Sequence, residues 1–209
     1  LGGSPSGVTS RGQTNKFFQE TPVPTPLLQN PAQPAEVTVN LGSYGGPQTI
    51  DSSNEFSGYY DIAVGSDTAG TQTAVVSVTE EGLLEVCRQR SPICSGQDSR
   101  FRNVRLDLRP GGAVVYADVS VPTPYGFTYD TTAGVVLQLD PSRRQFQFAG
   151  VDLDGELYDS PPAELQETVA EFERTGNDVL NQLSVNAGTG DLRLSEVQID
   201  DATLTLILR

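Results

Sequence analysis

The sequence contains no histidine, tryptophan or methionine among its 209 residues. Histidine is the commonest general base and a frequent metal ligand, so its absence excludes the usual catalytic triad and most transition-metal sites. Carboxylates alone can catalyse glycoside hydrolysis, but no feature of the sequence marks a buried, polarised carboxylate pair. We therefore expect a protein that is not an enzyme, with no catalytic residues and no cofactor.

Basic residues are also few. The chain has 13 Lys and Arg against 27 Asp and Glu, a net charge of -14, and no basic stripe. A nucleic-acid backbone would be repelled, so we exclude nucleic acid as a partner. No run approaches the ~20 apolar residues that span a bilayer. Membrane attachment is therefore expected only through an unseen anchor or a partner.

Cysteine occurs twice, as Cys87 and Cys94 in "CRQRSPIC". Two thiols without histidine cannot build a structural zinc site, and the spacing is not the CxxC of redox proteins. The six intervening residues include Pro92 and allow the chain to fold back at the end of a helix into a local disulfide. We favour that disulfide because an acidic, Gly/Ser-rich chain is typical of extracytoplasmic proteins. The alternative is two free thiols buried as small apolar residues.

The first 35 residues are rich in Gly, Ser and Pro, as in "TPVPTP". Such a segment cannot bury enough surface to fold alone, so we expect an extended tail. Its plausible anchors are Phe17, Phe18, Leu27 and Leu28, held by the domain itself, by a neighbouring subunit or only by a crystal neighbour. The start "LGGSPSG" resembles the tether after a lipoprotein cleavage site, although the required cysteine is absent from this chain.

Residues 36–209 predict one β-rich domain of the α+β class. The 21 Gly and 14 Pro suit many turns, and apolar residues alternate in several segments. Thr79 is a suitable N-cap for a short helix that begins with Glu80 and is closed by Pro92. Strands are expected at 36–41, "YYDIAVG", "TAVVSV", 101–108, 113–121, 134–139, 145–148 and in the closing "LRLSEVQIDDATLTLILR", with a loop from 42 to 58.

The stretch "VDLDGE" suggests a calcium loop. In an EF-hand the glycine is sixth, which would make Gly150 the first residue and Pro161 the twelfth, and neither can serve as a ligand there. Alternating flanks and an Asp-Gly pair instead predict a hairpin turn with solvated carboxylates. We expect no metal, while a weak non-EF site of Asp152, Asp154 and Asp159 stays open.

Aromatic residues alternate in "PTPYGFTYD", where Tyr125, Phe127 and Tyr129 share one face of a predicted strand. Aromatics at this spacing more often pack against a sheet than bind a ligand. We therefore expect these three side chains to be packed.

The segment "PPAELQETVAEFERTGNDVLNQLSV" predicts an amphipathic helix of about 20 residues, with Pro162 in its first turn. Its apolar stripe must lie on a sheet, and the simplest interpretation is that the stripe forms part of the hydrophobic core. A helix across apolar strands can also leave a groove without catalytic groups, suited to a lipid tail. The residues expected in this groove are Phe146, Phe148, Leu165, Val169, Phe172, Val179 and Leu183.

From about Ala74 to Arg209 the chain resembles the LmeA-type phospholipid-binding proteins, whose fold is similar to tubular lipid-binding domains. The resemblance is carried by "VSVTEEGLLEV", "FRNVRLDLRPGGAVVYADV", a second hairpin, the helix "PPAELQETVAEF" and the closing "LRLSEVQIDDATLTLIL". It implies a long curved antiparallel meander wrapped around one long helix that holds acyl chains. The Pro-rich tail, the added region 36–73 and the cysteine pair depart from that pattern.

From these observations we expect an extracytoplasmic protein, secreted or surface-anchored, that binds a lipid or another apolar ligand. The alternative, from a different class, is a structural subunit of an extracellular or membrane-associated assembly. In that case the tail of residues 1–35 would contact a neighbouring subunit, for example by adding a strand to its sheet edge.

Overall fold

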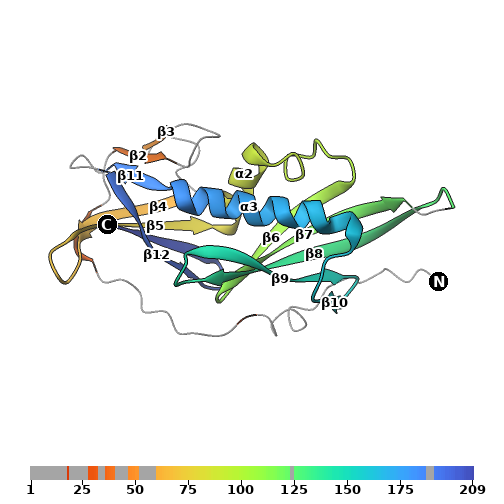
Figure 1. Cartoon of the computed structure of the whole chain (residues 1–209). Helices are drawn as coiled ribbons and strands as arrows, with labels where there is room; N and C mark the ends of the chain where they lie inside the picture. The colour runs from red at the N-terminus through yellow and green to blue at the C-terminus, as the bar shows by residue number, and fades with distance from the viewer. Residues whose placement is uncertain are drawn as a thin grey trace, which may run out of the picture.

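The computed structural model describes residues 18, 28–32, 36–40, 47–51, 60–122, 125–186 and 191–209. These residues form two antiparallel sheets and two α-helices, α2 and α3 (Figure 1). The expected α+β class with predominant β structure is confirmed at this level. The expected single meander is not what forms, because the strands divide between an eight-stranded and a five-stranded sheet.

The larger sheet is built from both ends of the chain, in the order β1-β4-β5-β13-β12-β11-β2-β3. Its N-terminal strands are β1 (Gln29–Ala32), β2 (Glu36–Asn40), β3 (Pro47–Asp51), β4 (Tyr60–Ser66) and β5 (Gln72–Thr79). Its C-terminal strands are β11 (Ser184–Asn186), β12 (Asp191–Ile199) and β13 (Thr203–Leu208). β3 lies inside the segment 42–58 that was expected to be a loop, so that prediction is wrong for these residues.

The smaller sheet is a true meander, in the order β10-β9-β8-β7-β6. Its strands are β6 (Phe101–Arg109), β7 (Gly112–Pro122), β8 (Thr128–Asp140), β9 (Gln145–Leu153) and β10 (Glu156–Tyr158). The turn between β6 and β7 joins the two sheets: the Gly111 amide donates to the carbonyl of Ile199 at 3.2 Å. The meander is thus an insertion between the two halves of the larger sheet.

Helix α2 (Glu80–Arg90) carries the chain out of the larger sheet. The Thr79 side chain accepts a hydrogen bond from the Gly82 amide, which confirms the predicted N-cap. The Glu80 carboxylate accepts one from the Leu108 amide at 2.7 Å and so ties the helix to β6. Cys87, near the end of this helix, and Cys94, in the segment that follows it, form the predicted disulfide, with Cα atoms 5.6 Å apart.

Helix α3 (Gln166–Gln182) returns the chain to the larger sheet and lies across both sheets (Figure 1). It has 17 residues, shorter than the expected ~20, because the first turn after Pro162 is a separate 3₁₀ turn, η3 (Ala163–Leu165). The side chain of Asn177 donates to the carbonyl of Phe146 and accepts from its amide, at 2.9 and 2.7 Å. This pair of bonds fixes the helix to β9.

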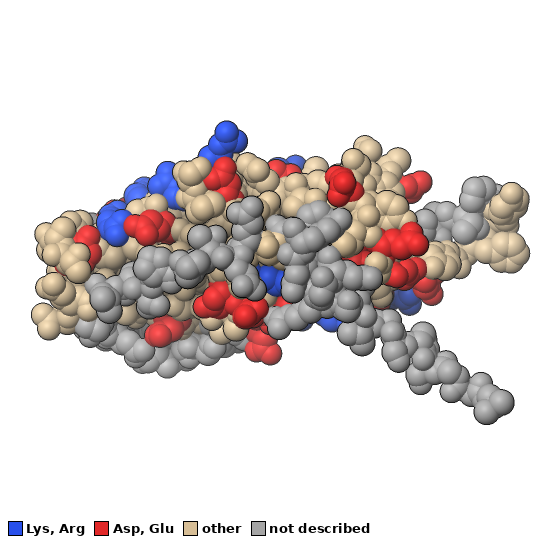
Figure 2. Space-filling view, turned by 90° about the horizontal axis from the view of Figure 1, so that it is seen from below, with Lys and Arg blue, Asp and Glu red and all other residues tan. Residues whose placement is uncertain are grey.

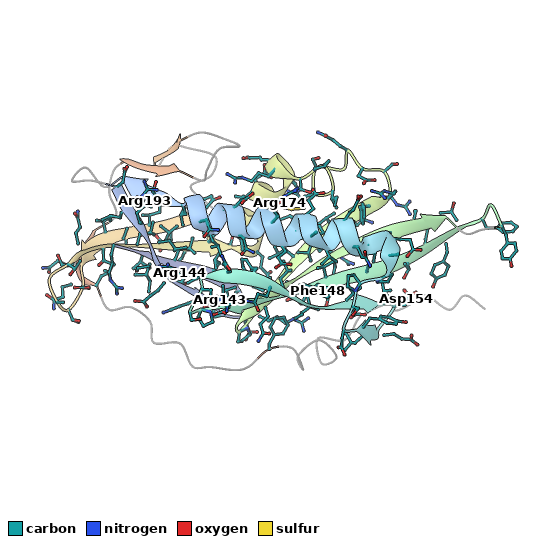
Figure 3. All side chains as sticks on the ribbon, viewed as in Figure 1. Arg143, Arg144, Phe148, Asp154, Arg174 and Arg193 are labelled. Atoms are coloured by element: carbon teal, nitrogen blue, oxygen red, sulfur yellow. A yellow bond between two sulfur atoms is a disulfide. The ribbon has the colours of Figure 1, made fainter. Side chains whose placement is uncertain are left out.

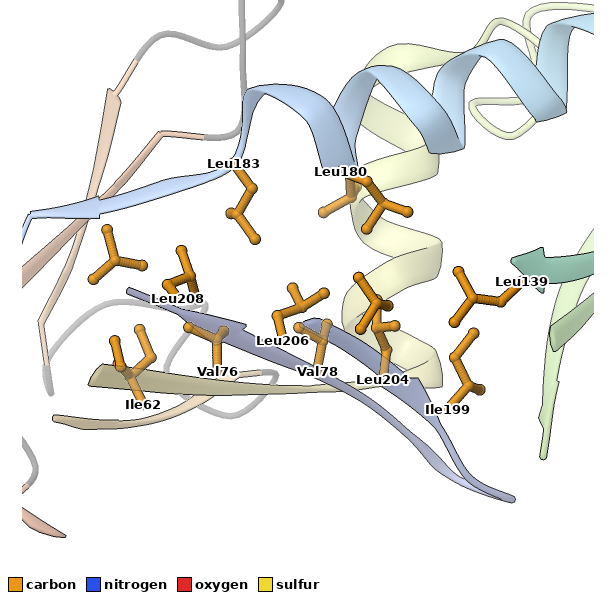
Figure 4. Packing of buried hydrophobic residues seen from close by; sticks show 14 of the residues in the cluster. Ile62, Val76, Val78, Leu139, Leu180, Leu183, Ile199, Leu204, Leu206 and Leu208 are labelled. Atoms are coloured by element: carbon orange, nitrogen blue, oxygen red, sulfur yellow. The ribbon is translucent and has the colours of Figure 1, made fainter. Parts of the chain in front are cut away.

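Two hydrophobic clusters lie beneath the helix. Its C-terminal part packs on the larger sheet, where Leu180 and Leu183 contact the strand residues shown in Figure 4. Its N-terminal part packs on the inner face of the meander, where Leu165, Val169 and Phe172 join a second cluster. A third, smaller cluster of Val114, Tyr116 and Val136 lies on the outer face of the meander.

Two parts of the expected tail contact this chain's own domain. Phe18 packs against the cluster on the outer face of the meander, and the Arg109 guanidinium lies 5.9 Å from the centre of its ring. Strand β1 pairs with β4, with Gln29 opposite Ser66. Of the four expected anchors, Phe18 and Leu28 are half-buried, and Phe17 and Leu27 lie outside the described residues.

Candidate functional site

The inner face of the meander extends beyond the start of α3 and leaves a pocket of about 450 Å³ there. Its floor is formed by residues of β7, β8 and β9, and η3 closes one side. The apolar lining residues are Val119, Ala133, Leu153, Pro162 and Leu165. Figure 3 shows this end of the molecule, with Asp154 labelled near the first turn of the helix.

The pocket exists because the side chains of β8 become smaller toward this end. Residues 131, 133, 135, 137 and 139 alternate along one face of the strand, and Val135, Leu137 and Leu139 fill the space under the helix. Thr131 and Ala133 take the corresponding positions in the pocket. The helix has not yet begun above them, so no larger side chain replaces the missing volume.

The rim of the pocket is polar and aromatic. The Tyr129 hydroxyl donates to a carboxylate oxygen of Asp154 at 2.6 Å, and the Tyr158 hydroxyl donates to Glu156 at 2.7 Å. Glu164 completes the acidic side of the rim, and no Lys or Arg is among the lining residues. The rim therefore carries negative charge next to aromatic rings.

The hydrogen bonds of the rim shift the titration of its groups. The Tyr129 hydroxyl holds the pKa of Asp154 below its usual range, and the same bond raises the pKa of Tyr129. Glu156 likewise raises the pKa of Tyr158 through its hydrogen bond. The buried Thr131 hydroxyl lies beside this group and, after Tyr129, helps to lower the pKa of Asp154.

The turn "VDLDGE" is the predicted hairpin. Asp154 and Gly155 both have positive φ, 51° and 88°, and connect β9 to β10. The two carboxylates differ more than the sequence suggested: Asp154 is exposed, whereas Asp152 is 0% exposed. The expectation that both are solvated is wrong for Asp152, because it lies on the same outer face of the sheet as the buried cluster of Val114, Tyr116 and Val136.

Asp152 is incompletely satisfied in this position. One carboxylate oxygen accepts the Gly155 amide at 2.8 Å, while the other is buried and has no hydrogen-bond partner. Burial raises the pKa of this carboxyl. No group of three or more His, Cys, Asp or Glu residues that could hold a metal ion occurs in the described part of the chain.

The seven residues predicted for an apolar groove do not form one surface. Leu165 lines the pocket, and Val169 and Phe172 are buried beside it in the same cluster. Phe148 packs on that cluster, and Phe146 packs on both clusters beneath the helix. Val179 and Leu183 belong to the cluster under the other end of α3. Most of the expected groove is therefore occupied by the protein's own core.

Other pocket residues were missed by the sequence reasoning. Val119 and Leu153 were assigned to ordinary strands, Ala133 was assigned to no element, and Tyr129 was expected to pack on the sheet. The signal that could have found them is the pair of small residues Thr131 and Ala133 in a strand otherwise rich in Val and Leu.

A second, smaller pocket of about 190 Å³ lies between the end of α2 and the middle of α3. Its lining includes Arg90 and Arg174 together with Glu171 and Asp178, so charges of both signs are mixed. The Ser91 hydroxyl donates to Glu171 at 2.6 Å and links the two helices there. This geometry is that of a polar contact between helices.

Comparison with known proteins gives no relative. No family model, curated protein or solved structure shows significant similarity to this chain. The structure defines a predominantly β protein with a disulfide and an apolar pocket at one end. No helix in the described ranges is long and apolar enough to cross a bilayer.

Proposed function

We propose that this protein binds the apolar chain of a lipid or a similar amphiphile in the pocket at the start of α3, without catalysing a reaction. The observation that carries the proposal is the pocket itself. Its walls are apolar, its volume of about 450 Å³ lies within the range of small-molecule sites, and its rim offers hydrogen-bonding groups. An apolar cavity with a polar mouth matches an amphiphile that enters tail first.

The compartment is part of the proposal. Disulfides persist mainly in oxidising environments, so the Cys87–Cys94 bond supports a secreted or cell-surface location. Anchoring would come from a partner or from a lipid attached outside the described residues.

We also propose kinship with the LmeA-type phospholipid-binding proteins, over about residues 74–209. Support comes from the order of elements: a helix with a Thr-Glu-Glu start, a meander, α3 and a closing hairpin. In this view the meander curves around α3 as in tubular lipid-binding domains. The ligand space is reduced to one end because core side chains occupy the rest.

The first test is direct binding of a monomeric lipid. Purified protein would be titrated with diheptanoylphosphatidylcholine below its micelle-forming concentration and followed by native mass spectrometry. We expect a one-to-one complex. Leu153→Trp, which fills the pocket from its half-exposed wall, should weaken binding about tenfold, since the chain loses apolar burial. Leu194→Trp is the matched control, a half-buried leucine of β12 outside the pocket.

The result that would overturn the proposal is equal behaviour of the two variants, or no lipid bound by the wild type. Loss of a native oligomer on deletion of residues 1–28 would instead favour the structural-subunit alternative. The contacts of Phe18 and β1 with this chain's own domain support the ligand-binding function over that alternative.

A further inference from the structure

The large apolar side chains exposed in the described part of the chain gather at one end. They are Tyr125, Phe127, Tyr129 and Tyr158, with exposed fractions of 87%, 74%, 55% and 40%. The sequence predicted that the first three pack on the sheet, and the structure shows the opposite. Clustered exposed aromatics usually mark an interaction surface, whereas scattered single ones do not.

Three of these residues form what we call the aromatic tip: Tyr125, Phe127 and Tyr129, at the hairpin between β7 and β8. The tip extends past the N-terminal end of α3, so no helix covers it (Figure 1). Gly126 has a φ of 79°, a backbone conformation that suits glycine and turns the chain between Tyr125 and Phe127. The sequence thus places aromatic side chains on both sides of a turn that projects from the body.

The aromatic tip is continuous with the mouth of the pocket. Tyr129 belongs to the tip and also lines the pocket. Tyr158 on β10 lines the same pocket, as does Asp154. A ligand leaving or entering the pocket therefore passes exposed aromatic rings. Tyrosine is suited to such a place because its ring is apolar and its hydroxyl remains hydrated.

The charges around the tip favour a neutral partner. Asp130 follows the tip and pairs with Arg102 at 3.2 Å, while Asp154, Glu156 and Glu164 surround the pocket mouth. In Figure 2 the end of the tip is uncharged, and acidic residues lie at its base. With a net charge of -14, the protein would be repelled by an anionic surface.

We propose that the aromatic tip and Tyr158 form a docking surface for the headgroup region of a zwitterionic lipid bilayer. Aromatic side chains concentrate at the interface between headgroups and acyl chains, and an uncharged tip can enter it without desolvating an ion. Docking brings the pocket mouth to the membrane, the place from which a lipid would be taken. The proposal of a docking surface is based on the exposure of the tip. Only the idea that docking serves lipid uptake rests on the proposed function.

The main experiment is flotation with vesicles of phosphatidylcholine. The wild type should float with the vesicles, and the double variant Tyr125→Ser/Phe127→Ser should bind about tenfold or more weakly, because two exposed aromatic contacts are lost. The matched control is Thr68→Ser/Ala69→Ser, in the exposed turn between β4 and β5 at the other end of the molecule. The control should float like the wild type.

A fluorescence reporter identifies the part that enters the membrane. Since the chain contains no tryptophan, Phe127→Trp introduces a single one at the tip. Its emission should shift to shorter wavelength when phosphatidylcholine vesicles are added, and Ala69→Trp should show no shift. Added salt should leave the shift unchanged, whereas anionic phosphatidylglycerol should weaken it at low salt.

Several results would overturn this inference. They are a wild type that does not float, a double variant that floats as well as the wild type, or equal shifts from the two tryptophan reporters. A shift of Phe127→Trp that depends on protein concentration without vesicles would mean that a second copy covers the tip. Uptake of monomeric diheptanoylphosphatidylcholine by the double variant separates the two proposals, since the pocket should remain functional when docking is lost.

Discussion

The last turns of α3 lie on the larger sheet and its first turn lies on the meander, and the two interfaces are filled differently. Leu180 is 2% exposed and belongs to a buried cluster of leucines, valines and isoleucines that includes residues of β4, β5, β12 and β13. Leu165 at the other end is also buried, yet one of its sides faces the pocket. One helix can thus complete a tight core over one sheet and form the edge of a binding site over another.

The difference shows how a pocket can arise without a special motif. A cavity forms where a strand continues past the helix that covers it and where its inward side chains become small. Close packing is the default in protein interiors, so such a gap costs least where it lies at the surface or is filled by a ligand. The meander meets the first condition, because its strands β7 and β8 extend beyond η3.

The largest expected effect comes from shortening one buried leucine side chain at each end of the helix: Leu180 in α3 and Leu165 in η3, just before it. Leu180→Ala should lower the free energy of unfolding by about 3–5 kcal/mol, since it leaves a cavity in a closed core. Leu165→Ala should cost about 2 kcal/mol, because its side chain already borders a hollow. Urea unfolding followed by circular dichroism measures both. Equal costs would show that the two ends of α3 are packed alike.

The next effect concerns the disulfide, which belongs to the meander half. Cys87 packs against the same cluster in which Cys94 is buried. Closing a loop with a sequence separation of 7 should stabilise the protein by about 2–3 kcal/mol, so Cys87→Ala/Cys94→Ala should lose that amount. Reduction of the wild type is the matched control and should lower the unfolding midpoint similarly. An unchanged unfolding midpoint in both cases would show that the disulfide does not stabilise this half of the protein.

The smallest effect compares the two carboxylates of the β9–β10 turn. Burial raises the pKa of Asp152 in the folded protein, so its contribution to stability is full below the unfolded pKa of about 4 and is lost as pH rises through the folded value. The Tyr129 hydroxyl lowers the pKa of Asp154, so its contribution is present above the unfolded pKa and is lost as pH falls through the folded value.

Substitution by asparagine separates these two contributions. Relative to the wild type, Asp152→Asn should gain stability as pH rises from 3 to 7, and Asp154→Asn should lose it over the same interval. Asparagine tolerates the positive φ at position 154, so backbone strain does not obscure the comparison. Thermal unfolding at each pH gives the two differences. If the stability difference from the wild type changed with pH in the same direction for both variants, Asp152 and Asp154 would not lie in different environments.

Local features of the structure were largely accessible from the sequence. Alternating apolar residues predicted β4 to β9, β12 and β13, because a strand with one buried face must alternate. Thr79 and the charges after it predicted α2, and the Asp-Gly pair predicted the β9–β10 turn. These signals depend on interactions between residues close in the chain. The disulfide also belongs to this group, since only seven positions separate its cysteines.

The site depended on contacts between distant segments. Which strands share a sheet is decided by pairings such as β11 with β2, far apart in the chain, and no local period encodes them. The same is true of Asp152, whose burial depends on its place on the outer face of the meander beside residues of other strands. Tyr125 and Phe127 alternate like packed residues, but their exposure depends on where α3 begins. The sequence by itself determined the elements, their caps and their turns. The tertiary structure alone decided where the helix leaves the sheet uncovered, because that gap depends on the relative lengths of elements that only packing brings together.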